Sequence, residues 1–153
     1  MRLLTGLTMS AVLATGLLAA PPALAAAQTA VSFAADSGDS CRRGFTEGSL
    51  ERYAGPVIRP TVLVEGLVSD EGVPTVCFPD NKYTTATFDG YDDTGLVATE
   101  TAKANDEQVK FAFKLSDSTG VRTITRVVVQ VCRHTNAPIG TSYCGKAQEY
   151  KIP

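Results

Sequence analysis

The chain contains a single histidine, His134, which lies two residues after Cys132. Such a histidine can act as the general base of a serine hydrolase if a nucleophile and an acid lie beside it. Serines and aspartates are present, but the Gly-x-Ser-x-Gly pattern that exposes a hydrolase nucleophile is missing. We therefore expect no catalytic residue, no cofactor and no enzymatic activity, and we interpret His134 as a surface residue that is available for binding.

Acidic side chains gather at Asp89, Asp92 and Asp93. Exported β domains can hold Ca²⁺ in acidic loops, but the ion requires about six to eight oxygen ligands. The segment 89–95 lacks the Asp-x-Asp-x-Asp-Gly series of the best-known calcium loop. A hairpin turn with Gly95 at a positive φ explains these aspartates equally well. We therefore predict no metal site, with calcium at this turn as the alternative.

Tyrosines are the strongest candidates for a binding surface. Tyr83 and Tyr91 share parity on one expected strand, opposite to Phe88, so both should point to the outer face of the sheet. Tyrosine is frequent in contact surfaces because it joins an apolar ring to a polar hydroxyl. Carbohydrate platforms generally use tryptophan, which this chain lacks, and ordinary cross-strand packing is the competing interpretation. The expected partner is an extracellular protein or polysaccharide.

The segment between Cys132 and Cys144 supports an alternative function. A disulfide across it would hold residues 133–143 as a rigid loop, in which Arg133 or Tyr143 is exposed to a protease as a pseudo-substrate. The alternative is therefore an inhibitor of an extracellular hydrolase. A plain stapled hairpin connection explains the same residues, because disulfides in small secreted domains are mostly structural.

The first 25 residues have the features of a secretory signal peptide. Arg2 precedes an apolar segment from Leu3 to Ala20, and the small-x-small site Ala23-Leu24-Ala25 follows. A membrane anchor is the competing interpretation, because the segment approaches the roughly 20 residues that span a bilayer. Glycines, a serine and threonines dilute the segment, so we expect cleavage near Ala25, secretion, and no membrane contact afterwards.

The charge balance excludes two classes of partner. Removal of Arg2 from the 14 basic residues leaves 13 against 16 acidic ones, a formal net charge of −3 for the mature chain. A mildly acidic chain without basic clusters is a poor match for nucleic acid or for an anionic membrane surface. The length suits one domain with its own core, and we expect a monomer.

Strand signals recur along the chain at spacings of roughly ten residues, separated by Gly, Asp, Asn and Pro. They predict an immunoglobulin-like antiparallel β-sandwich of about seven strands over residues 41–153, after a flexible leader or weak first strand at 26–40. Residues 41–55 hold three glycines without alternation and are expected to form a loop. The expected strands are Thr61–Val68, Thr75–Phe78, Tyr83–Tyr91, Leu96–Ala102, Gln108–Leu115, Ile124–His134 and Ser142–Ile152.

Four cysteines in an exported chain indicate two disulfides. The alternate valines of 127–131 share one face and are the better candidates for the core, which places Cys132 on the outer face. An inter-sheet bridge from Cys77 to Cys132 requires an inward cysteine and is therefore disfavoured. The favoured pairs are Cys132 with Cys144 and Cys41 with Cys77, unless a bulge near Arg133 reverses the parity of the strand.

Several motifs together resemble the small secreted proteins of actinobacteria. These are the leader ending in Ala23-Leu24-Ala25, the strand opening Arg59-Pro60-Thr61-Val62, and the two cysteine segments Val129–Arg133 and Tyr143–Gly145. The stretch Phe88–Ala98 is similar to hairpins of immunoglobulin-like and carbohydrate-binding sandwiches. The resemblance implies an immunoglobulin-like β-sandwich and an extracellular compartment, and it implies no particular activity.

Overall fold

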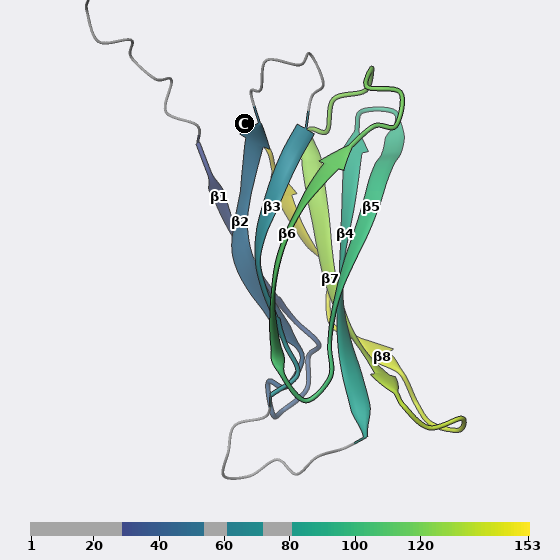
Figure 1. The fold of residues 1–153 in the computed structure, drawn as a ribbon. Coiled ribbons are helices and arrows are strands. Elements are labelled where there is room, and N and C mark those ends of the chain that lie inside the picture. The colour runs from purple at the N-terminus through teal and green to yellow at the C-terminus, as the bar shows by residue number, and fades with distance from the viewer. Residues whose placement is uncertain (1–28, 54–60, 72–80) are drawn as a thin grey trace, which may run out of the picture.

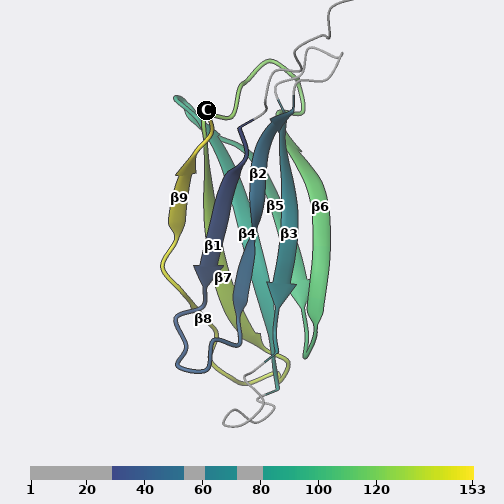
Figure 2. The ribbon, with the colours of Figure 1, turned by 90° about the vertical axis from the view of Figure 1, so that its left-hand side faces the viewer.

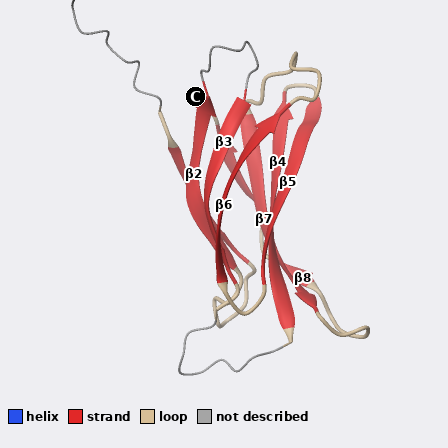
Figure 3. Ribbon diagram, in the orientation of Figure 1, coloured by secondary structure: helices blue, strands red, loops and turns tan. Residues whose placement is uncertain are grey.

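The computed structural model describes residues 29–53, 61–71 and 81–153, and this part of the chain contains nine β-strands and no helix (Figure 3). All the strand pairings are antiparallel. The prediction of an all-β fold is confirmed. The strands are β1 (Val31–Asp36), β2 (Phe45–Tyr53), β3 (Thr61–Ser69), β4 (Lys82–Asp92), β5 (Gly95–Ala104), β6 (Gln108–Ser116), β7 (Arg126–Thr135), β8 (Tyr143–Cys144) and β9 (Gln148–Lys151).

Two sheets face each other across one apolar core (Figure 1). The four-stranded sheet has the order β1-β2-β3-β6, and the five-stranded sheet has the order β5-β4-β7, with β8 and β9 pairing with successive stretches of β7. Phe88 of β4 fills the space between the sheets, its ring centroid 5.3 Å from that of Phe33 and 5.2 Å from that of Phe113. The arrangement is sandwich-like, as two sheets with one shared core require.

Alternation along the strands of the five-stranded sheet separates a core face from an outer face. Val127, Val129 and Val131 of β7 are fully buried, which confirms the prediction that these valines face the core. In β4, Phe88 is fully buried, whereas Tyr83 is half-buried on the opposite face. The outer face therefore presents the residues between the core positions.

The predicted loop at 41–55 contains strand β2, so that prediction is wrong for most of the segment. Gly48 of β2 pairs directly with Gly66 of β3. A Cβ at Gly48 would lie 2.0 Å from the carbonyl oxygen of Glu65, and the ring of Phe33 covers the glycine pair on the core side. Gly48 and Gly66 allow the two strands to approach closely, whereas the sequence analysis had assigned Gly48 to a loop.

Three further expectations concern the other strands. The expected strand Thr75–Phe78 lies outside the described residues. The segment 26–40, left open as a leader or a weak first strand, contains β1. The returning strand Ser142–Ile152 is divided into β8 and β9. The interruption lies between Cys144 and Gln148. The N–H of Gly145 still donates to the carbonyl oxygen of Val131 of β7 at 2.9 Å, and a Cβ at Gly145 would lie 1.8 Å from the carbonyl oxygen of Asp36, so glycine is required beside β1.

Tyr150 of β9 joins the two sheets at one edge of the sandwich, where β9 lies beside β1 (Figure 2). Its hydroxyl donates to the carbonyl oxygen of Ala34 at 2.6 Å and accepts from the N–H of Ala34 at 3.0 Å. The ring also makes an edge contact with Phe33, with centroids 6.3 Å apart. The last strand is thus fastened to the first.

Replacing Tyr150 with phenylalanine should remove both hydrogen bonds and keep the ring. We expect the free energy of unfolding to fall by about 1–2 kcal/mol, because a typical hydrogen bond contributes about 1 kcal/mol net. Urea unfolding followed by circular dichroism measures the change. Tyr53→Phe, at a position that is 42 % exposed, is the matched control and should leave the midpoint unchanged. Identical midpoints for the two variants would contradict the assigned role of Tyr150.

Candidate functional site

Cys132 of β7 and Cys144 of β8 form a disulfide between residues that lie directly opposite each other in the ladder. This is the favoured pairing of the sequence analysis, and it closes the 133–143 loop. A disulfide of this kind indicates an oxidising environment. The other expected pair joins Cys41 to Cys77, and Cys77 lies outside the residues that the structure describes.

Arg133 does not lie on the surface, so its assignment as an exposed binding or protease-contacting residue is wrong. It belongs to β7, and its side chain is fully buried. Its Nη2 lies 3.1 Å from Oδ1 of Asp70, and its Nη1 lies 3.8 Å from Oδ2 of Asp39. Because residues 131 and 133 share parity, Arg133 continues the core face of β7 that Val131 occupies.

Asp70, at the end of β3, is the principal partner of Arg133. Its carboxylate accepts hydrogen bonds from the hydroxyl of Thr84 and from the backbone N–H of Asp106. The backbone N–H of Asp70 donates to the carbonyl oxygen of Glu107 at 2.9 Å. One buried carboxylate therefore joins β3, β4, β7 and the β5–β6 turn.

Asp39 extends this network into the loop between β1 and β2. Burial alone raises its pKa, but hydrogen bonds from the Ser37 hydroxyl and from the backbone of Arg43 and Gly44, together with the charge of Arg133, lower the pKa by more. The result is a pKa below the usual range, so Asp39 stays ionised opposite Arg133. Gly44 makes room for the arginine, since a Cβ there would lie 3.1 Å from Cγ of Arg133.

The outer face of the five-stranded sheet brings Tyr83 and His134 together. They are opposite each other in the β4–β7 register, and their rings stack with centroids 5.1 Å apart. Nε2 of His134 lies 2.9 Å from the hydroxyl oxygen of Thr85, within hydrogen-bonding distance. Nζ of Lys103, from β5, lies 3.8 Å from the Tyr83 ring centroid. We call Tyr83, Thr85, Lys103 and His134 the β4 cluster.

The other predicted tyrosines lie apart from the β4 cluster. Tyr91 is eight residues further along β4, about 26 Å away at the usual rise of a strand, and the Arg126 guanidinium carbon lies 4.4 Å from its ring centroid. Tyr143 pairs with Arg133 in register and so belongs to the opposite side of the sheet, where Nζ of Lys82 lies 6.0 Å from its ring centroid.

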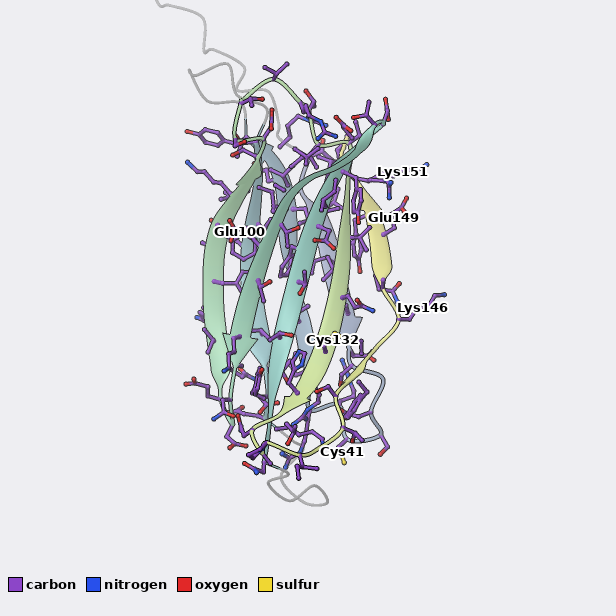
Figure 4. All side chains as sticks on the ribbon, turned by 90° about the vertical axis from the view of Figure 1, so that its right-hand side faces the viewer. Cys41, Glu100, Cys132, Lys146, Glu149 and Lys151 are labelled. Carbon is purple, nitrogen blue, oxygen red and sulfur yellow. A yellow bond between two sulfur atoms is a disulfide. The ribbon has the colours of Figure 1, made fainter. Side chains whose placement is uncertain are left out.

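Figure 4 looks onto this outer face, with Cys132 on β7, Lys146, Glu149 and Lys151 along one edge and Glu100 near the other. Arg126 and Lys151 are opposite each other in the β7–β9 register. Arg126 also pairs with Glu149 at 3.2 Å, and both side chains are substantially exposed. Arg126 and Lys151 therefore place positive charge at the end of the face where β7 begins, and Lys103 places it in the β4 cluster.

The carboxylates of Asp89 and Asp92, at the turn between β4 and β5, already have hydrogen-bond partners within the protein. Arg122 donates to both carboxylate oxygens of Asp92 at 2.7 Å, and the backbone N–H groups of Thr94 and Gly95 donate to Oδ1. The hydrogen bond from Arg122 is the main cause that holds the pKa of Asp92 well below its usual range. The hydroxyl of Thr99 donates to Asp89. In the described residues, no three His, Cys, Asp or Glu side chains are grouped to hold a metal ion.

A groove of about 530 Å³ lies on the outer face of the four-stranded sheet. It is lined by Ser32, Phe33, Ala34, Glu47, Gly48, Gly66, Leu67 and Lys110. It is therefore separate from the face that carries the β4 cluster.

Comparison of the chain with protein-family models, curated proteins and solved structures finds no match. No helix capable of crossing a membrane occurs among the residues that the structure describes.

Replacing Arg133 with methionine should destabilise the fold strongly, because it leaves Asp70 buried without its cation. Loss of one partner of a buried ion pair costs about 3–5 kcal/mol. The matched control is Arg126→Met on the same strand, where the ion pair is exposed and contributes about 1 kcal/mol or less.

Guanidinium unfolding of both variants tests this expectation. If Arg133→Met gives too little folded protein, Arg133→Met combined with Asp70→Asn should recover part of the loss, since no buried charge then remains uncompensated. Equal midpoints for Arg133→Met and Arg126→Met would show that the buried pair does not hold the fold.

Proposed function

We propose that the protein is a secreted, non-catalytic binding module that acts outside the cell. The leader at 1–25 with its small-residue site supports export, and the disulfide between Cys132 and Cys144 supports an oxidising compartment. We describe it as immunoglobulin-like only in architecture, because the strand order β1-β2-β3-β6 differs from the A-B-E-D order of immunoglobulin constant domains.

The β4 cluster is the observation that carries this proposal. A lysine, a tyrosine and a histidine from three neighbouring strands meet on one open sheet face, beside the disulfide that fixes β7 to β8. Fixed donors on a rigid sheet suit recognition, because little conformational entropy is lost when a partner binds. The proposed contact surface is therefore the outer face of the five-stranded sheet, from Tyr83 to Tyr91.

The combined substitution of Tyr83 and Tyr91 with alanine should abolish most binding. Retention of the purified protein on insoluble polysaccharide and cell-wall fractions should fall about tenfold, as expected when anchor side chains of a contact surface are removed. Tyr53→Ala, on the four-stranded sheet, is the matched control and should be retained like the unaltered protein. Undiminished retention of a correctly folded double variant would exclude this face as the contact surface.

A second candidate is an inhibitor of an extracellular hydrolase that presents the 133–143 loop. The specific observation is Ile139, which is 93 % exposed between β7 and β8 in a loop closed by the disulfide. Arg133 cannot be the presented residue because it is buried, and Tyr143 is only 36 % exposed, so Ile139 takes that role in this candidate.

An inhibitor of this kind should block a secreted protease at a one-to-one ratio, measured by titration of the protease activity. Ile139→Gly should weaken inhibition about tenfold or more, because an apolar anchor that fills a partner's pocket dominates such contacts. Thr141→Gly, at an exposed position of the same loop, is the control for loop flexibility and should inhibit normally. Full activity of the proteases in the culture fluid at excess protein would rule this candidate out.

A further inference from the structure

The aromatic rings on the outer face of the five-stranded sheet position cations and offer little bare ring surface. Lys103 approaches Tyr83 from β5 and His134 stacks on it from β7, so the ring is contacted from both neighbouring strands. Tyr91 likewise contacts the guanidinium of Arg126. Cation–aromatic contacts of this type hold a charged group in place at the surface. The chemistry that matches fixed cations is an anionic ligand.

The region between the two cation–aromatic pairs is polar, and Asp89 is the charged residue of β4 that lies within it. Thr87 lies opposite Thr101 on one side and opposite Gln130 on the other, and Thr85 lies next to it on the same face. Protein–protein contacts usually have an apolar centre, whereas this centre carries hydroxyl and amide groups. A ligand that is itself rich in hydroxyls fits it better.

The spacing of the two cations sets the length of the ligand. Lys103 is opposite Thr85 in the register, and Arg126 is opposite Tyr91. Six residues of strand separate these positions, which places the cations about 20 Å apart along β4. A single sugar cannot reach both, but an extended chain of sugars along the strand can.

We propose that the ligand is a linear acidic polysaccharide that lies along β4. Its carboxylates pair with Lys103 near one end and with Arg126 near the other, and its hydroxyls hydrogen-bond to the threonines between them. The inference rests on the proposed function, in that this face is taken as the contact surface. Arg126 must leave its ion pair with Glu149 to bind the ligand. This costs little free energy because the ion pair is exposed. Asp89 also lies along this path on β4, and its carboxylate accepts a hydrogen bond from the hydroxyl of Thr99.

Affinity electrophoresis of the purified protein through gels that contain polygalacturonate, neutral pullulan or polyphosphate tests the proposal. We expect retardation by polygalacturonate, weakened by added salt because the contacts are ionic. The double variant Lys103→Gln with Arg126→Gln should bind about tenfold more weakly, since two exposed ion pairs are lost. The control is Lys110→Gln with Lys114→Gln on the opposite sheet, where Lys114 also lies over a tyrosine, Tyr53, at 4.8 Å. This control should bind polygalacturonate as the unaltered protein does.

Four results would overturn the proposal. Equal retardation by pullulan, unaffected by the Lys103/Arg126 change, would make the ligand a neutral polymer and leave the binding module standing. Equal retardation by polyphosphate would remove the preference for carboxylates. An equal loss of polygalacturonate binding in the Lys110/Lys114 control would show that binding depends only on the net charge of the protein. Retention by none of the polymers, together with no retention on wall fractions, would remove both the ligand class and the proposed function.

Discussion

The buried pair of Arg133 and Asp70 fixes one end of the sandwich. Two charges removed from water cost several kcal/mol each and are tolerated only where partners surround them. Asp70 meets this requirement through Thr84 and the backbone of Asp106, and the arginine reaches on to the β1–β2 loop. The pair also sets the surface chemistry. Because Arg133 points inward, its chain neighbours Cys132 and His134 must point outward, one into the disulfide and the other against Tyr83.

Much of this framework could be predicted from period-2 patterns. The valine face of β7, the outward tyrosine of β4 and the Cys132–Cys144 pair all follow from parity. Arg133 obeys the same parity, but its charge and its place before the loop suggested exposure. Its partner Asp70 follows Val68 by two residues, and this separation by an even number of positions is the signal that could have joined the two. A pattern within one strand does not show which residues of different strands become neighbours.

Lys103 illustrates that limit. Counting back from the two-residue turn at Asp93-Thr94 would place Ala102 opposite Thr85 and turn Lys103 toward the core. The register shifts between Gly90 and Tyr91, so Lys103 lies opposite Thr85 on the outer face. A single extra residue thus exchanges the two faces of β5. The β4 cluster exists because of this bulge, which has no clear marker in the sequence. Gly48 of β2 was misassigned to a loop for a related reason, because it is required by the close approach of β3 and not by a turn.

The fastening of Tyr150 to Ala34 has a consequence for how the molecule meets copies of itself. An edge strand exposes unpaired backbone groups that can accept a strand from another chain and start aggregation. At Ala34 of β1 both backbone groups are occupied by one tyrosine hydroxyl, a side chain of the same molecule. A hydroxyl blocks such growth where another strand would extend the sheet. At Ala34 this edge of the four-stranded sheet is therefore closed to a strand from another copy of the chain.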